Sequence, residues 1–303
     1  MPKTTEIEAN GLRFTADVSG DATMEAAICL HGYPNSRYSW SQLHEVLGAH
    51  GICCVAPDQR GYSCGARPLD VPAYHVDHLV DDVIAIADAQ GVGKFHLIGH
   101  DWGGQIAWLT ASRHPDRLRS LAVLSRPHPA AFAYALEHDS EQAKRSRHHK
   151  IFQEEDMADR LLADDSKAIR NTLCFENAAG LFGSEGQAQA LPRRMSDDKA
   201  REHLSVLNDR AAMDAVLNWY RAAYDGVSTL ARADVPKIDV PTLYIWGRED
   251  MSVGEIAATA TAEQVLADYQ FEALAGAGHF LAEEMPEEVN ALLLAHIQRN
   301  SAR

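Results

Sequence analysis

The feature that most restricts the fold is an alternation of short apolar runs with helical periodicity in the first third of the chain. Apolar runs at residues 26–30, 52–56, 95–98 and 121–124 are separated by stretches with apolar residues at helical spacing. Nearly continuous apolar runs of this length are typical of strands that are buried on both faces. The alternation therefore predicts an α/β fold, with a mostly parallel sheet and helices on both faces.

The alternation stops near residue 129 and returns more than a hundred residues later. Between about residues 129 and 225 the sequence contains no convincing buried strand and is rich in Ala, Leu, Arg and acidic residues. Strands return at 242–246 and about 269–274, and a final helix is expected at 286–298. The simplest account is one sheet domain interrupted by a helical insertion. The expected units are a core domain at 1–128 and 227–303 and a helical cap at 129–226.

The charge balance excludes several classes of partner. The chain has 303 residues, with 28 Lys+Arg against 43 Asp+Glu and a net charge of −15. Nucleic acid and anionic membrane both require a basic face, so neither is expected as a partner. No apolar run approaches the ~18 residues of a spanning helix, and the N-terminus lacks an apolar signal segment. The chain has five cysteines and no C-x-x-C pair, and Cys53 and Cys54 lie within the apolar run at 52–56, which predicts that these two are reduced core thiols of a cytoplasmic protein.

A sharp turn follows the apolar run at 95–98. Its sequence, Gly99-His100-Asp101-Trp102-Gly103, matches the pattern in which small residues flank a nucleophile between a strand and a helix. The strained turn exposes the middle side chain above the sheet. Asp101 is therefore the candidate nucleophile. The alternative is that Asp101 only caps the following helix.

Three further loops are expected at the same edge of the sheet, because each follows an apolar strand. One carries Glu249 and Asp250, another ends at His279, and the third is His31–Pro34. Ligands of open α/β sheets bind outside the carboxyl ends of the strands. We expect the backbone N–H groups of Tyr33 and Trp102 to form an oxyanion hole there.

Three segments of the chain resemble those of a known family. HGYP at 31–34, DQRGYS at 58–63 and GHDWGG at 99–104 resemble the epoxide hydrolases and haloalkane dehalogenases of the α/β-hydrolase fold. The resemblance implies that fold and an Asp nucleophile. It also implies a triad in the order nucleophile, acid, His, which would be Asp101, Asp250 and His279. The family's G-x-x-D spacing favours Asp250, and Glu249 is the alternative.

Residues of the insertion help to distinguish an epoxide from an alkyl halide as the substrate. Residues 217–221 resemble the cap segment that carries a ring-opening Tyr in epoxide hydrolases, and Tyr220 is the matching residue. His148 stands where the family usually has its second Tyr, and some epoxide hydrolases use a His–Tyr pair. The resemblance therefore implies that Tyr220 and His148 both hydrogen-bond the epoxide oxygen and promote its departure. Haloacetate dehalogenases also have His there, but they carry Arg at the positions of Trp102 and Gln105. Many haloalkane dehalogenases have Asn at the position of Tyr33.

These comparisons favour an epoxide hydrolase that forms a covalent alkyl ester on Asp101. The alternatives are a haloalkane or haloacetate dehalogenase with the same nucleophile, or a non-catalytic ligand receptor on a hydrolase scaffold. A small molecule, an epoxide or an alkyl halide, is the expected partner, and a homodimer is left open. No phosphate-binding loop is evident, so no cofactor is expected. Adjacent helical residues such as His148 and His149 point ~100° apart, so no metal site is expected.

Overall fold

The computed structural model describes residues 2–21, 25–174, 195–223 and 234–301. Its centre is an eight-stranded sheet in the order β1-β2-β4-β3-β5-β6-β7-β8. β1 and β2 pair antiparallel, as do β2 and β4, and all other neighbours are parallel. The strands are β1 (Lys3–Ala9), β2 (Leu12–Ser19), β3 (Ala26–Leu30), β4 (Cys53–Pro57), β5 (Phe95–His100), β6 (Leu118–Leu124), β7 (Thr242–Gly247) and β8 (Tyr269–Leu274).

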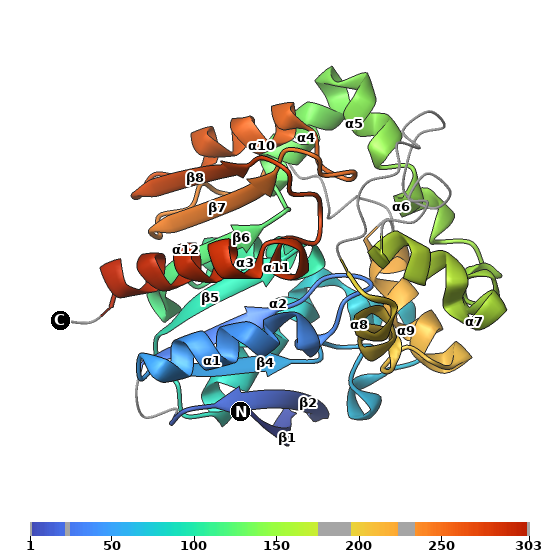
Figure 1. Ribbon diagram of the computed structural model, residues 1–303, viewed down its shortest axis with the longest axis horizontal. Coiled ribbons are helices and arrows are strands. Elements are labelled where there is room, and N and C mark those ends of the chain that lie inside the picture. The colour runs from blue at the N-terminus through green and yellow to red at the C-terminus, as the bar shows by residue number, and fades with distance from the viewer. Residues whose placement is uncertain (1, 22–24, 175–194, 224–233, 302–303) are drawn as a thin grey trace.

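Alternate residues of the central strands feed two separate cores. In β3, Ala26, Ile28 and Leu30 belong to one apolar cluster, whereas Ala27 and Cys29 belong to the other. Helices cover both faces, with α1 and α12 on the face toward the viewer in Figure 1 and α2 and α3 on the other. The expected α/β class is confirmed. The bounds are α1 (Ser41–Ala49), α2 (Val76–Ala89), α3 (Trp102–Arg113), α10 (Glu255–Ala260), α11 (Leu281–Glu284) and α12 (Pro286–Arg299).

The N-terminal hairpin was not anticipated from the sequence. β1 is largely exposed, and its Thr and Glu side chains give no apolar run. The turn between β1 and β2 is Asn10-Gly11, with φ of 50° and 71°. Asn-Gly with two positive φ angles is the strongest short-range hairpin signal, so this pair would have revealed the two strands.

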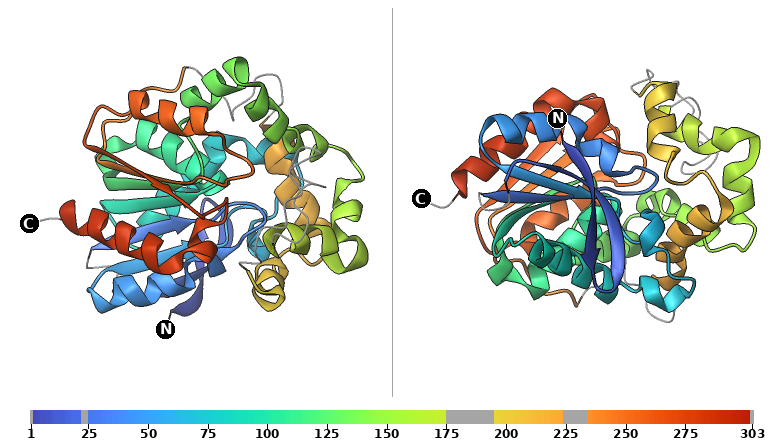
Figure 2. Two further views of the ribbon diagram at one scale, coloured as in Figure 1. Left: turned by 45° about the horizontal axis from the view of Figure 1, so that its top comes forward. Right: turned by 90° about the horizontal axis from the view of Figure 1, so that it is seen from below.

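The insertion is helical wherever the structure describes it. Residues 129–174 and 195–223 contain no strand. The expected boundary between residues 226 and 227 lies outside the described residues. The same holds for Gly180, Gly183 and Gly186, at which the sequence favours breaks between helical segments. Figures 1 and 2 show α7, α8 and α9 grouped at one end of the sheet. The helices are α4 (Pro129–His138), α5 (Ser140–Arg145), α6 (His148–Ile151), α7 (Met157–Cys174), which is kinked at 163–166, α8 (Asp197–Leu204) and α9 (Arg210–Ala222).

No helix in these ranges, or elsewhere in the described chain, combines the length and apolarity needed to cross a bilayer.

Two glycines allow β5 to turn directly into α3. A Cβ atom on Gly99 would collide with the backbone of Gly103, and one on Gly103 would collide with the backbone of Leu30 and His31. These neighbours are main-chain atoms, so they cannot move aside as a flexible side chain would. The turn that carries Asp101 therefore requires small residues at both positions.

This packing predicts that Gly103→Ala lowers the free energy of unfolding by at least about 1–3 kcal/mol, as overpacking of a core does. Gly93→Ala is the matched control, because nothing lies within 4 Å of a Cβ atom there. Its effect should stay within about 0.5 kcal/mol. Urea unfolding of both variants measures the difference, and equal stabilities would refute the steric argument.

Candidate active site

Asp101 occupies the turn between β5 and α3 with φ of 49°, outside the usual range for a side-chain-bearing residue. The N–H of Tyr33 donates to its Oδ1 at 3.0 Å, and the N–H of Trp102 also bonds the carboxylate. The side chain does not cap α3, so the alternative reading as a helix cap is not what the structure shows. A Cβ atom on Gly32 would collide with Asp101, which explains the glycine in the HGYP loop.

His279 lies between two carboxylates. Its Nδ1 is 2.9 Å and 3.0 Å from the two oxygens of Asp250, and its Nε2 is 3.5 Å from Oδ2 of Asp101. Asp250 is 1% exposed, and its Oδ1 accepts from the N–H groups of Ser252 and Val253. These bonds fix the carboxylate that orients the imidazole. The structure thus brings together all three residues expected to form a triad.

The alternative acid, Glu249, lies elsewhere. Its side chain is exposed, and its Oε1 accepts from the N–H of Gly276 at 3.0 Å. It therefore holds the loop before His279 and does not face the imidazole.

The two carboxylates control the charge of His279. Burial alone would lower the pKa of the imidazole, but the charges of Asp250 and Asp101 raise it to about 10. Burial would likewise raise the pKa of Asp101, but the hydrogen bond and charge of His279 hold it below its usual range. These shifts favour a protonated imidazole on His279 and an ionised carboxylate on Asp101 in the resting site at neutral pH.

A small cavity connects the sheet edge with the helical insertion. Its empty space amounts to about 260 Å³, including space that is open to solvent. Five of the seven predicted site residues line it. The lining residues are Tyr33, Asp101, His148, Thr172, Tyr220, Met251, Ser252, His279 and Phe280. Thr172, Met251, Ser252 and Phe280 were not anticipated, because neither spacing nor motif distinguishes them in the sequence.

Tyr220 comes from α9 and packs edge-on against Trp102, with ring centroids 5.2 Å apart. A side-chain hydrogen bond also joins the two residues, and the indole N–H can only donate. Burial and the nearby Asp101 carboxylate raise the pKa of the phenol well above its usual value. Tyr220 is therefore a protonated hydroxyl on the same cavity as the ionised Asp101.

His148 lines the cavity, but its hydrogen bonding differs from the expectation. Its Nδ1 lies 3.0 Å from the carbonyl oxygen of Arg145, which can only accept. Nδ1 therefore carries the proton of the neutral ring, and Nε2 is an acceptor. Burial lowers the pKa of His148 to about 4, so the ring is neutral at neutral pH. In that form Nε2 cannot donate to a substrate oxygen.

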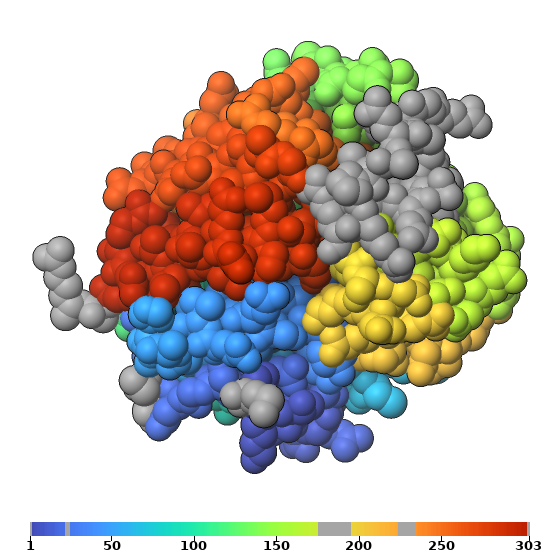
Figure 3. Space-filling view, in the orientation of Figure 1, coloured from blue at the N-terminus to red at the C-terminus, as the bar shows by residue number. Residues whose placement is uncertain are grey.

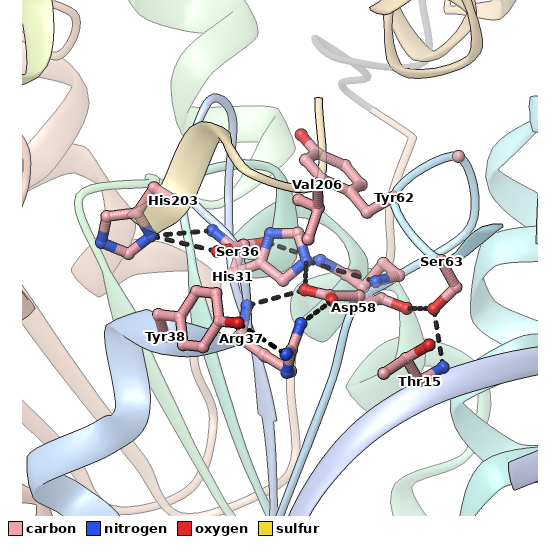
Figure 4. Close-up of polar contacts among 12 residues, drawn as sticks. Thr15, His31, Ser36, Arg37, Tyr38, Asp58, Tyr62, Ser63, His203 and Val206 are labelled. Carbon is pink, nitrogen blue, oxygen red and sulfur yellow. Dashed lines mark hydrogen bonds and ion pairs between the residues drawn. The ribbon is translucent and has the colours of Figure 1, made fainter. Parts of the chain in front are cut away.

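A buried polar network supports the HGYP loop (Figure 4). Asp58 follows β4 and forms an ion pair with Arg37, and it also accepts from the backbone N–H of Arg37 at 2.9 Å. His203 of α8 accepts from the N–H of Ser36 at 3.2 Å. The network thus links the core and the insertion on one side of the loop that presents Tyr33. Within the described ranges, no group of three His, Cys, Asp or Glu side chains is placed to hold a metal ion.

The electrostatics predict that Asp250→Asn lowers the pKa of His279, because it removes a carboxylate that stabilises the imidazolium. Glu249→Gln is the matched control and should leave that pKa unchanged. NMR titration of the His279 ring measures both. If the pKa of His279 falls in Glu249→Gln and does not fall in Asp250→Asn, the assignment of Asp250 as the acid is wrong.

Comparison with known proteins identifies the family. A family model described as alpha/beta hydrolase fold matches residues 27–286. Epoxide hydrolase 4 of Mus musculus is 30% identical over 300 residues, which cover 98% of this chain and 79% of that protein. Epoxide hydrolase A of Mycobacterium tuberculosis is 30% identical over 310 residues, with 95% of each chain covered. The crystal structure of Epoxide Hydrolase A from Mycobacterium thermoresistibile matches with a TM-score of 0.80 at 27% identity, covering 98% of both chains. This chain therefore belongs to the epoxide hydrolase family of the α/β hydrolase fold.

Proposed function

We propose that this protein adds water to an epoxide and releases a vicinal diol, through an alkyl ester on Asp101. One observation carries the proposal: an ionised carboxylate and a protonated phenol, Asp101 and Tyr220, line the same small cavity. Opening an epoxide requires a nucleophile at carbon and a proton donor at the departing oxygen. We also propose that residues 129–226 act as a cap over this site. A cytoplasmic location and a homodimer stay predictions.

In the first step, Oδ2 of Asp101 attacks one epoxide carbon, and the bond from that carbon to oxygen breaks. Tyr220 donates its hydrogen bond to the oxygen as negative charge develops there. The ester has no charge, so His279 loses one of the two carboxylates that hold its proton. The imidazolium gives up one proton while the new hydroxyl gains one, and the charges balance.

In the second step, neutral His279 takes a proton from water, and that water attacks the ester carbonyl of Asp101. The negative charge forms on Oδ1, to which the N–H of Tyr33 already donates, and the N–H of Trp102 bonds the same carboxylate. Collapse releases the diol and restores the Asp101 carboxylate. His279 is again an imidazolium, so the cycle closes on the resting state.

The position of Trp102 favours an epoxide over a halide. In the related haloalkane dehalogenases, a Trp at this position binds the leaving halide. Here Trp102 shares a side-chain hydrogen bond with Tyr220 and does not line the cavity. The indole N–H orients a proton donor instead of facing a leaving group.

The mechanism predicts that Tyr220→Phe slows formation of the ester on the order of 10²–10³-fold, as loss of one donor to a developing oxyanion does. His148→Gln should slow it much less, because neutral His148 does not donate from Nε2. Rapid-quench measurement of the first turnover compares the two. If ester formation slows more in His148→Gln than in Tyr220→Phe, His148 and not Tyr220 is the main donor to the epoxide oxygen.

The proposed function is tested by trapping the ester. His279→Gln should still be alkylated but should not release product, so intact-protein mass should rise by the mass of the whole epoxide. The added mass should map to the peptide that contains Asp101. Asp101→Asn, freshly prepared, is the control and should gain no mass.

Each alternative gives a different mass. A dehalogenase expels the halogen, so an adduct with haloalkanes or haloacetates but with no epoxide would overturn the epoxide assignment and keep the nucleophile. A receptor that binds without chemistry would give no covalent gain under denaturing conditions. Attachment to another residue would overturn the mechanism.

A further inference from the structure

A buried amide of the insertion holds the loop that carries Asp250. Gln142 of α5 is 0% exposed. Its Oε1 accepts from the N–H of Gly254 at 2.8 Å, and its Nε2 donates to the carbonyl of Ser252 at 2.8 Å. Both ends of one side chain therefore bind the main chain of the loop at 250–254. In Figure 3 the green segment of α4 and α5 lies directly against the orange segment that follows β7.

The same loop is also bound by Arg145, one turn later on α5. Its guanidinium donates to the carbonyl oxygen of Asp250, while its own carbonyl accepts from Nδ1 of His148. One residue thus contacts both the acid's main chain and the histidine of the cavity. The loop itself contributes Met251 and Ser252 to the cavity wall.

We propose that Gln142 and Arg145 are positioning residues, which set the place of the Asp250 carboxylate and so the orientation of His279. The link is short: Ser252, whose carbonyl Gln142 binds, also donates its N–H to Oδ1 of Asp250. Neither side chain reaches the reacting atoms. This inference rests on the proposed function only for its effect on turnover, because the loop geometry exists in the resting protein.

The physical cost of losing Gln142 lies in the loop. Without the amide, the N–H of Gly254 and the carbonyl of Ser252 are buried without these partners, and such groups are costly to leave unpaired. The loop is expected to shift until they find water or another partner. A shift of about 1 Å in a group that orients a catalytic side chain can cost on the order of 10²-fold in rate.

The first test needs no substrate. In Gln142→Met, which keeps the length of the side chain, the low-field NMR resonance of the His279 Nδ1 proton should move and the pKa of His279 should fall. Loss of that resonance in His279→Gln assigns it. Ser146→Ala is the matched control, because it removes the hydrogen bond from Gln142 to the residue that follows α5 and leaves both bonds to the loop. This control should not change either quantity.

Arg145→Met tests the second contact at a less buried position. If Gln142→Met does not fold, the His279 resonance and titration in Arg145→Met alone test the proposal. An unchanged His279 resonance and titration in the folded variants would overturn the proposal.

A kinetic readout separates this inference from the proposed function. The ratio of ester hydrolysis to ester formation does not depend on how much of a preparation is folded. It should fall about 10- to 100-fold in Gln142→Met and stay constant in Ser146→Ala. If His279→Gln forms no adduct with epoxides, the proposed function fails while the NMR result still tests the positioning role. If adducts form and the ratio is unchanged in Gln142→Met, the positioning role fails and the function stands.

Discussion

The structure depends on one buried interaction, the imidazole of His279 held between the carboxylates of Asp101 and Asp250. Burying three ionisable groups is costly unless each has partners. Main-chain N–H groups supply these partners, from Tyr33 and Trp102 on one carboxylate and from the loop after Asp250 on the other. All of these groups follow strands of the parallel part of the sheet. The loops at the carboxyl ends of these strands must therefore pack closely against one another.

The same interaction explains why the protein needs its insertion. Water around the imidazolium would weaken the attraction that keeps its pKa high and Asp101 ionised. Helices at the carboxyl end of the sheet reduce that exposure, since His279 is only 4% exposed. They also bring Tyr220 to the cavity, and Gln142 forms two hydrogen bonds with the main chain of the loop that begins at Asp250. The insertion therefore contributes Tyr220, the proposed proton donor, and contacts that support the loop after Asp250.

Much of the core and most of the site could be predicted from the sequence. Parallel strands end at one edge, so a turn at Asp101, an acid at 250 and a histidine at 279 had to lie close together. The β1–β2 hairpin was missed because it lacks apolar runs, although Asn10-Gly11 signalled it. The role of Gln142 left no signal, because one amide in a polar stretch has no periodicity. The tautomer of His148 depends on a carbonyl that only the folded helix places beside it.

The covalent mechanism requires the Asp101 carboxylate to supply the oxygen atom that enters the diol in the first turnover. In a single turnover with enzyme in excess over epoxide in ¹⁸O-labelled water, the diol should receive its new oxygen from the Asp101 carboxylate. The diol should therefore carry no label, and the label should be found in the peptide that contains Asp101. Label in the diol at the first turnover, with none in that peptide, would show that water attacks the epoxide directly and would contradict the covalent mechanism.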